Sequence, residues 1–279
     1  MSSSAQVNWP PEAPVWRFRW EAIDGDSEAI AFRDVFFRGM KVLHKASLPM
    51  IRVHYESNNG PYKDQLSTWN MRGPVKTYEH VQSGFRHLVV ESYHVIGRYH
   101  LINRWFFRSD GLILPQLHSA GLQHPATHQH HVYYRFDFDI EGPAGDLALA
   151  HMNTGGNWGY GPGWMPLPKE TWQVTISANS WAVIDKQTQR GYLINRGPND
   201  APCDAFEPAD MYVVAYHGEE DLKGRLGSPR SADIFSHINN ESIDGQDLVF
   251  WYVSHLHHQY PGHDGDWHVV GPLLWPIRY

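Results

Sequence analysis

The chain has 279 residues, of which 42% are hydrophobic and 19% are charged, and its formal net charge is -7. This length is enough for one large β-domain or two small ones, and we favour one. The charges form no long acidic or basic run, so the sequence gives no reason to expect binding to nucleic acid or to a membrane surface. Cys203 is the only cysteine, which excludes an intrachain disulfide and thiolate metal clusters.

The first residues differ in composition from the rest. Residues 1–14 are rich in Ser and Pro without a core-forming pattern, so we predict a disordered tail there and a single domain over residues 15–279. The N-terminus has neither the basic start nor the apolar core of a signal peptide, and no stretch approaches transmembrane length. These features favour a cytoplasmic protein.

Strand patterns begin directly after this tail. Val15–Trp20 and Ala29–Phe36 alternate between apolar and polar residues, with turn residues at 24–26 between them, which predicts a β-hairpin. Residues 41–55 continue as a strand. The polar segment 56–73, with its Asn, Gly and Pro residues, predicts an irregular loop.

The polar loop contains Tyr62 and Asp64, and the β-rich run after it contains Tyr99. On pattern alone, Tyr62 and Asp64 in the polar loop are solvated turn residues. In the β-rich run 86–107, alternation places Tyr99 on the same face as Leu101 and Val95. Tyr99 is therefore expected to be buried, and on pattern alone it is an ordinary core tyrosine. The opposite face of this run carries Arg98, His100 and Arg104.

The central pattern of the chain is the strand Thr127–Gly142. Its even positions form an apolar face that includes two imidazoles: His128, His130, Val132, Tyr134, Phe136, Phe138 and Ile140. Its odd positions are polar: Gln129, Arg135, Asp137 and Asp139. Histidines at i and i+2 of a strand have Cα atoms roughly 6–7 Å apart. Both rings can therefore reach one metal ion, whose third ligand must come from elsewhere in the chain.

Residues 151–168 are rich in Gly, Trp and Pro and predict a long ordered loop. Its aromatic residues Trp158, Tyr160 and Trp164 would either cover a site or fill a surface groove. Further strands are predicted at Trp172–Ile176, Ser180–Ile184, Tyr192–Ile194 and Met211–Tyr216. Cys203 lies in a turn-like segment and is expected to be inert, and no stretch has the period of a long helix.

The last strand, Asp247–His258, is apolar and ends in histidines. His258 is in phase with Leu256 and Tyr252, whereas His255 and His257 belong to the opposite face. His258 is thus the natural candidate for the third metal ligand. Residues 259–279 are rich in Pro and Gly and are expected to wrap around the domain.

Together these residues resemble the catalytic domain of the copper amine oxidases. The family has an HQH pair followed by R-x-D-x-D-I-x-G, matched by residues 128–130 and 135–142 at the same spacings. It also has a late D-I-V-x-W-Y strand whose aspartate precedes the third copper histidine by eleven positions, as Asp247 precedes His258. Three upstream segments are similar to the family as well: Trp16–Trp20, Leu43–Tyr55 and Val95–Gly111.

The resemblance implies an all-β fold, a large antiparallel β-sandwich, with copper bound by His128, His130 and His258. It also implies a structural cation, usually calcium, held by Asp137, the carbonyl of Phe138, Asp139 and Asp247. This division agrees with ligand chemistry, because carboxylate and carbonyl oxygens suit a hard cation and imidazoles suit copper.

The family's cofactor is topaquinone, a quinone made from a tyrosine with bound copper and oxygen. The aligned residue is Tyr99, although Arg98 and His100 stand where the family motif has an asparagine and an acid. Tyr55 matches the tyrosine that hydrogen-bonds the quinone oxygen. Asp64, in a Y-x-D pattern with Tyr62, is the candidate general base, which needs a pKa raised by burial.

Three functions follow as alternatives. The first is an oxidase that deaminates an amine with O2 through the quinone at Tyr99, and the family implies a homodimer. The second is a quinone-free copper oxidase or oxygenase that acts on a small molecule, in which Tyr99 stays a tyrosine or becomes a ligand. The third is a non-catalytic copper-binding protein, against which the presence of Tyr99, Tyr55 and all three histidines argues.

Overall fold

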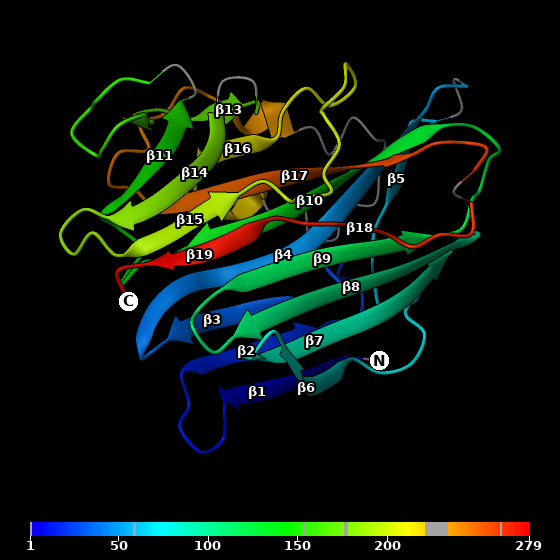
Figure 1. Ribbon diagram of the computed structural model, residues 1–279, viewed down its shortest axis with the longest axis horizontal. Coiled ribbons are helices and arrows are strands. Elements are labelled where there is room, and N and C mark those ends of the chain that lie inside the picture. Colours follow the sequence, from blue (N-terminus) through cyan, green and yellow to red (C-terminus); the bar gives the residue numbers. More distant parts are fainter. Residues whose placement is uncertain (1, 58–59, 153–154, 176–177, 221–233, 263) are drawn as a thin grey trace.

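The protein is built almost entirely from two antiparallel β-sheets (Figure 1). The computed structural model describes residues 2–57, 60–152, 155–175, 178–220, 234–262 and 264–279. Within these ranges the only helices are two short 3-10 turns, η1 (Gly218–Glu220) and η3 (Ile234–His237). The predicted all-β fold, a large antiparallel sandwich, is confirmed.

The first sheet contains the predicted metal ligands. Its path of neighbouring strands is β1 (Ser3–Trp9), β2 (Trp16–Ala22), β3 (Ala31–Phe37), β4 (Met40–Tyr55), β10 (His128–Phe138), β17 (Leu248–His258), β16 (Met211–Ala215) and β13 (Thr171–Gln173), and β5 (Tyr62–Asp64) pairs with β4. The predicted hairpin is confirmed, because β2 and β3 pair antiparallel.

The second sheet contains Tyr99. Its path is β12 (Trp164–Pro166), β11 (Asp146–Met152), β14 (Ala178–Asp185), β15 (Gly191–Asn195), β19 (Leu273–Ile277), β9 (Ile113–Ala120), β8 (Tyr99–Arg108), β7 (Phe85–Ile96) and β6 (Lys76–Gln82), and β18 (His268–Val270) pairs with β9. The β-rich run 86–107 is therefore two strands, with a turn at Gly97 and Arg98 between them.

The main core fills the space between the two sheets. Strands such as β2 and β8 alternate buried and more exposed positions, as expected for a strand with one face toward the core. Large aromatic rings meet there: the ring centroids of Phe32 and Trp105 are 4.8 Å apart, and those of Phe18 and Phe107 are 4.4 Å apart. Burial of this apolar area is the main stabilisation of the sandwich.

A second, smaller core covers the outer face of β10 and β17. It contains Tyr133 and Trp251 and is packed against η3. The odd positions of β10 are consequently buried as well: Arg135 and Asp137 are 2% and 1% exposed. The acidic residues of this face are therefore not solvated, as the structural-cation interpretation requires, although Gln129 at the start of the strand is only partly buried.

The N-terminal segment differs from its prediction. Met1 lies outside the described residues, but Ser3–Trp9 is a strand paired along its length with β2. The disordered tail predicted over residues 1–14 is wrong for this part of the segment. Val7 and Trp9 point into the core, at 8% and 3% exposure, and their alternation with polar residues was obscured by the serines before them.

Two predicted loops contain short strands. In segment 56–73, Tyr62–Asp64 forms β5 against β4, and residues 58–59 lie outside the described residues. In segment 151–168, Trp164–Pro166 forms β12 against β11, and residues 153–154 lie outside them. Backbone pairing with an existing strand organises both stretches, which have too few residues for a visible alternation.

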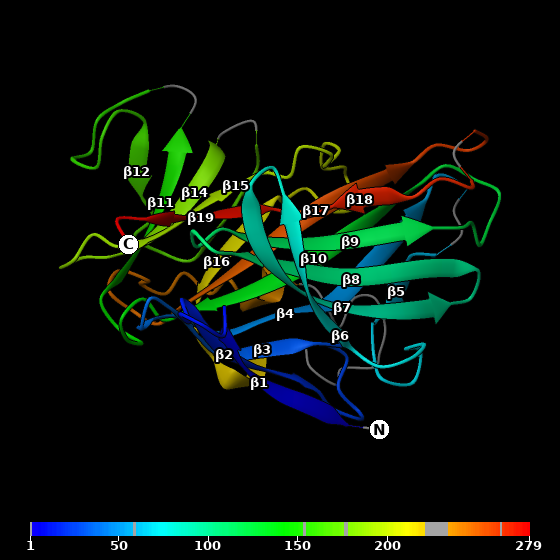
Figure 2. The same ribbon diagram turned by 60° about the horizontal axis from the view of Figure 1, so that its bottom comes forward.

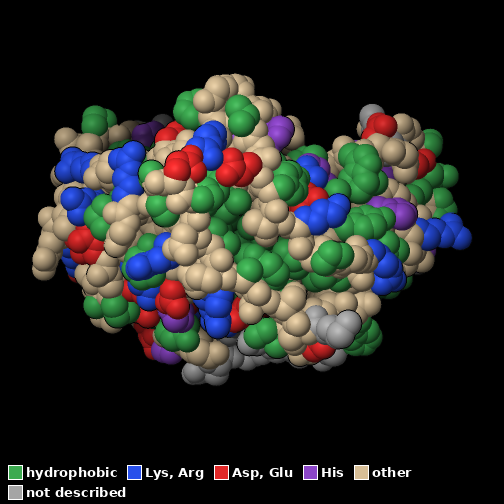
Figure 3. Space-filling model, turned by 90° about the horizontal axis from the view of Figure 1, so that it is seen from below, with side chains coloured by type: hydrophobic (Ala, Val, Ile, Leu, Met, Phe, Trp, Pro, Cys, Tyr) green, Lys and Arg blue, Asp and Glu red, His purple; other side chains and the backbone are tan. Residues whose placement is uncertain are grey.

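The later strands are close to their predicted positions, although β13 ends at Gln173 and Ile176 lies outside the described residues. The C-terminal segment enters the second sheet as β18 and β19, which Figure 2 shows beside β9 and β15. The face in Figure 3 mixes basic, acidic and apolar side chains. In the described part of the chain, no helix has the length and apolarity needed to cross a membrane.

Candidate metal and tyrosine site

The site is centred on the first residues of β10. His128 lies directly opposite His258 in the pairing of β10 with β17, and opposite Tyr55 in the pairing of β10 with β4. Alternation puts His130 on the same face as His128. The ring centroids of His128 and His258 are 4.8 Å apart, and those of His128 and His130 are 4.9 Å apart. His128 and His130 are thus clustered in the core with His258, which is distant from them in the sequence.

Tyr99 reaches this cluster from the other sheet, as the first residue of β8. The preceding turn is held by the side chain of Gln123, whose Oε1 accepts a hydrogen bond from the Arg98 amide at 3.0 Å. Gly97 has a φ of +57°, and a Cβ on it would collide with that same Oε1. Glycine is therefore favoured here, because it adopts a positive φ without strain and leaves room for the Gln123 side chain. The ring of Tyr99 points inward and is 4% exposed.

A chain of hydrogen bonds connects the two tyrosines to the cluster. The hydroxyls of Tyr55 and Tyr99 are 2.5 Å apart, and the Tyr99 hydroxyl is 3.0 Å from Nε2 of His128. Nδ1 of His128 donates to the carbonyl of Ala126 at 2.9 Å. This bond fixes the His128 tautomer in which Nε2 is unprotonated and faces Tyr99. Burial raises the pKa of Tyr99 far above its ordinary value, and the bond to Tyr55 adds to the effect.

His130 is the most isolated of the three imidazoles. It is 2% exposed, and neither ring nitrogen has a hydrogen-bond partner. Burial, followed by the neighbouring His128 and His258, lowers its pKa well below the ordinary value, so the ring is neutral. Burying a polar ring without partners is costly. An unpaired neutral imidazole beside two others fits an imidazole-seeking metal such as copper.

His258 has a carboxylate partner. Its Nε2 lies 3.2 Å from Oδ1 of Asp264, in the turn that follows β17. Histidines that bind metals usually donate their second ring nitrogen to such an acceptor. Asp264 was not predicted, because it lies in a turn where no strand pattern points to it.

The three imidazoles are not yet at coordination distance from one another. Among the residues described, the only three His, Cys, Asp or Glu side chains with ligand atoms within 4.8 Å of one another are Glu170, His217 and Glu241. Both oxygens of Glu170 already accept backbone hydrogen bonds, and His217 and Glu241 form an ion pair near the surface. This trio has the contacts of an ordinary polar cluster.

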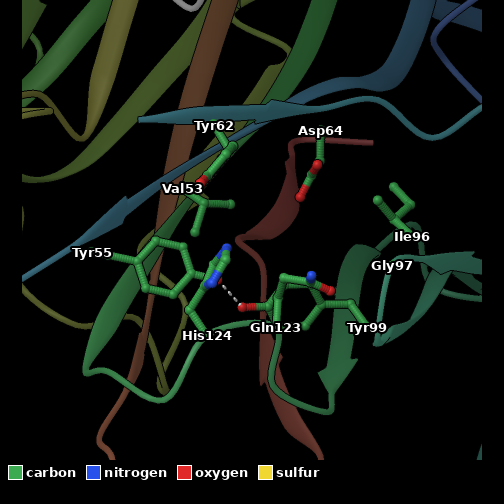
Figure 4. A pocket seen from close by; sticks show the side chains of 9 residues that line it. All are labelled: Val53, Tyr55, Tyr62, Asp64, Ile96, Gly97, Tyr99, Gln123 and His124. Carbon is green, nitrogen blue, oxygen red and sulfur yellow. Dashed lines mark hydrogen bonds between the residues drawn. The ribbon is translucent and has the colours of Figure 1, made fainter. Parts of the chain in front are cut away.

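A cavity of about 230 Å³ opens beside Tyr99 (Figure 4). Tyr62 and Asp64 lie on one side of it and Gln123 and Tyr99 on the other; the remaining lining residues are Val53, Tyr55, Ile96, Gly97 and His124. The pairing of β5 with β4 places Asp64 opposite Ile51 and so brings it to this cavity. The solvated-turn interpretation of Asp64 is wrong, whereas Tyr62 is 42% exposed.

The electrostatics of Asp64 are unusual for a carboxyl near the surface. Burial raises its pKa to about 6. Its negative charge in turn helps to raise the pKa values of Tyr55 and Tyr99, although burial is the main cause for both. A carboxyl with this pKa is ionised for the most part at neutral pH and can still accept a proton.

The acidic residues lie at the other end of β10. Asp137 accepts a hydrogen bond from Arg135 at 3.1 Å, and Asp139 forms an ion pair with Lys41. Each of Asp137, Asp139 and Asp247 has a second oxygen, Oδ1, that is buried without a hydrogen-bond partner. Burial, together with the charges of Asp137 and Asp139, raises the pKa of Asp247 to about 7. Unpaired carboxylate oxygens suit a hard cation such as calcium, although the ligand oxygens of these three residues do not all lie within 4.8 Å of one another.

Three other features noted in the sequence lie outside the Tyr99 cavity: His100, the aromatic residues of segment 151–168 and Cys203. His100 is exposed and its Nδ1 contacts the Tyr93 hydroxyl at 2.5 Å, so it faces away from Tyr99 as expected. The aromatic residues of segment 151–168 do not line the Tyr99 cavity; Tyr160 and Trp164 line a separate surface cavity. Cys203 is partly buried, and burial raises the pKa of its thiol, which agrees with an inert residue.

A second pair of imidazoles lies on the outer face of the same two strands. His131 and His255 are fully buried, and their Nδ1 atoms are 2.9 Å apart. Asp204 and Asp210 flank the pair at 3.5 Å each. His255 and His258 lie on opposite faces of β17, as predicted, but the contact between His255 and His131 was not predicted.

Comparison with known proteins supports the fold. Three similar solved structures are the amine oxidase of Aspergillus nidulans (TM-score 0.71, 16% identity), a copper-containing benzylamine oxidase from Hansenula polymorpha (0.73, 13%) and the lysyl oxidase of Pichia pastoris (0.72, 15%). They match 95%, 98% and 95% of this chain, which spans 51%, 59% and 51% of their own lengths. Neither protein-family models nor curated protein sequences give a match. The chain thus has the fold of these oxidases over about half their length.

Proposed function

We propose that this protein is a copper-dependent oxidase that deaminates a primary amine. The reaction converts the amine, O2 and water into an aldehyde, ammonia and hydrogen peroxide. The observation that carries the proposal is the position of Tyr99, whose hydroxyl contacts His128 of the imidazole cluster and whose ring borders the cavity that contains Asp64. The fold shared with amine oxidases supports the same reaction class.

The side chains of His128, His130 and His258 would hold the copper. The unpaired nitrogens of His130 and the fixed tautomer of His128 support this assignment. Copper, together with a topaquinone derived from Tyr99, would supply the electron-accepting chemistry that no ordinary side chain can provide. The oxygen of residue 99 would be held by the Tyr55 hydroxyl, which lies 2.5 Å away.

Asp64 would be the general base. It borders the same cavity as Tyr99, and its pKa of about 6 suits removal of a proton from the carbon next to the amine nitrogen. Val53 and Ile96 in the lining give the cavity an apolar part, which excludes water from the carbon that loses the proton. Because the cavity has a volume of about 230 Å³, the part of the substrate that carries the amine would have to be small.

A quinone-free copper oxidase is the second candidate. It is favoured by the contact between the Tyr99 hydroxyl and His128, because a tyrosine this close to the imidazoles can also serve as a metal ligand. Arg98 and His100, which replace the asparagine and the acid of the family motif, point in the same direction. In this candidate Tyr99 remains unmodified.

Two further parts of the proposal come from the resemblance to the family. The unpaired oxygens of Asp137, Asp139 and Asp247, with the Phe138 carbonyl, would bind a structural calcium ion. The protein would act as a homodimer.

Oxygen uptake with a panel of primary amines tests the proposal. The protein would be loaded with copper in air and supplied with benzylamine, phenethylamine and 1,5-diaminopentane, while oxygen, aldehyde and peroxide are measured. Amine-dependent oxygen uptake with equal aldehyde and peroxide is expected. A copper-loaded protein that consumes no oxygen with any of these amines, and whose Tyr99 is unmodified, would contradict the amine oxidase and favour the second candidate.

A further inference from the structure

The imidazole cluster contains one more ring than the predicted ligand set. The ring of His268 lies against His258, with centroids 4.9 Å apart and planes inclined by 34°. The corresponding values for His128 and His258 are 4.8 Å and 41°. His268 is therefore as close to His258 as His128 is, so His258 has one imidazole neighbour on β10 and another on β18.

The position of His268 is fixed by regular structure. It is the first residue of β18, which pairs with β9 so that His268 lies opposite Ser119. β18 also packs beside β17, the strand that ends in His258. A side chain on a paired strand is held more firmly than one on a free loop, which suits a metal ligand.

His268 is reached from a different side of the molecule than Tyr99. It is partly exposed and lines an open groove of about 540 Å³ together with His257, Gln259, Asp266 and Trp267. This groove shares no lining residue with the cavity beside Tyr99. The ring of His268 thus lies between the solvent of the groove and the buried imidazoles.

The contact between Asp264 and His258 indicates how these rings would share a metal. Because Asp264 lies 3.2 Å from Nε2 of His258, Nδ1 of that ring is the nitrogen that a metal would take. Copper(II) favours four nitrogen or oxygen ligands in a tetragonal arrangement. The three buried histidines would fill three of these coordination positions, and water or another side chain would fill the fourth.

We propose that His268 is a fourth imidazole ligand of the copper. This inference rests on the metal site of the proposed function and adds to it a ligand on β18. A fourth imidazole in place of water raises the affinity for copper. A small molecule that enters from the groove would then reach the copper only by displacing His268.

The test is copper binding by the purified protein, followed by electron paramagnetic resonance of the copper(II) form. The variants are His268→Gln, His128→Gln and, as a matched control, His257→Gln, which changes an exposed imidazole in the same groove. Thermal unfolding of each metal-free variant checks that it is folded. None of these measurements depends on turnover.

His268→Gln is expected to weaken copper binding on the order of ten-fold or more and to change the nitrogen hyperfine pattern from four imidazoles to three. His257→Gln is expected to match the original protein in both respects. If His268→Gln binds copper with unchanged affinity and spectrum while His128→Gln does not bind it, the fourth ligand is contradicted and the three-histidine site stands. If His128→Gln binds copper normally, the metal site of the proposed function fails as well.

Discussion

The two ends of β10 carry two different kinds of polar cluster in the same core. At the His128 end the groups are imidazoles: His130 is neutral and both of its nitrogens lack partners, and His258 contacts the carboxylate of Asp264. At the other end the groups are carboxylates, and two of them already contact Arg135 and Lys41. The buried ring of His130 therefore needs no counter-charge when the metal is absent, whereas the carboxylates at the other end of β10 are only partly balanced.

This difference separates the roles of the two predicted metals. A neutral imidazole can remain buried in the metal-free protein at moderate cost, so loss of copper should leave the fold intact and remove the chemistry. An ionised carboxylate in the core needs a positive partner, so loss of a cation at the second end should lower stability. The predictions below follow from this contrast.

The largest expected effect is on function at the imidazole end. His130→Gln should abolish copper binding and reduce amine oxidation by at least about 10³-fold, because the metal supplies several kcal/mol of the catalysis. The midpoint of thermal unfolding of the metal-free variant should stay close to that of the metal-free original protein. Copper content by mass spectrometry, oxygen uptake and calorimetry measure the three quantities.

His100→Gln is the control for this variant, since His100 is exposed on the opposite face of β8 from Tyr99. It should bind copper and turn over as the original protein does. Full copper loading of His130→Gln would place the metal elsewhere.

A smaller functional effect is expected at Asp64. Asp64→Asn should lower kcat/KM by about 10²- to 10⁴-fold, the usual contribution of a general base. In the original protein, activity requires the ionised carboxylate. Because burial raises its pKa to about 6, kcat/KM should fall as the pH drops through that value. The pH profile of oxygen uptake checks both points.

Asp24→Asn is a suitable comparison, because Asp24 is an exposed carboxyl that accepts a hydrogen bond from Thr68. It should keep the full rate and the same acidic limb. An Asp64→Asn variant that is equally active would assign the base to another residue.

The smallest effect is a change in stability at the carboxylate end. Burial raises the pKa of Asp247 from its ordinary value of 3.8 to about 7 in the folded protein, so ionisation of this carboxyl lowers stability as the pH rises through this interval. Calcium should offset this loss. We expect calcium to raise the unfolding midpoint by a few degrees at pH 8 and by less at pH 5.

Asp247→Asn should remove this dependence on calcium, whereas Asp244→Asn should retain it. Asp244 is exposed and pairs with Lys186 at the surface, where such pairs contribute little. An equal calcium effect in both variants would exclude Asp247 as a ligand.

The family resemblance and the strand-rich pattern together predicted the all-β fold, and alternation along the chain predicted the main phases of its strands. Alternation in β10 and β17 places His128, His130 and His258 on one face, and the register confirms that His128 lies opposite His258. Tyr99 was correctly expected to be buried. In each case the information lies within one strand, where a period of two residues determines the face.

The errors come from contacts between distant segments. Asp64 resembles a solvated turn residue until β5 pairs with β4, and Asp264 and His268 have no strand pattern that distinguishes them. The sequence favoured a structural cation for the carboxylates of β10, but it did not predict that Arg135 and Lys41 contact them in the core. Sequence periodicity shows which face a side chain occupies but not what covers that face.

We propose that Tyr99 becomes the cofactor beside a copper ion bound by the imidazoles. Mass spectrometry of the peptide that contains Tyr99, after metal-free protein is incubated with copper in air, tests it most directly, with Tyr99→Phe and an oxygen-free incubation as controls. We expect a quinone-sized mass gain on Tyr99, with Tyr55 unchanged. An unmodified Tyr99 in fully copper-loaded protein would contradict it.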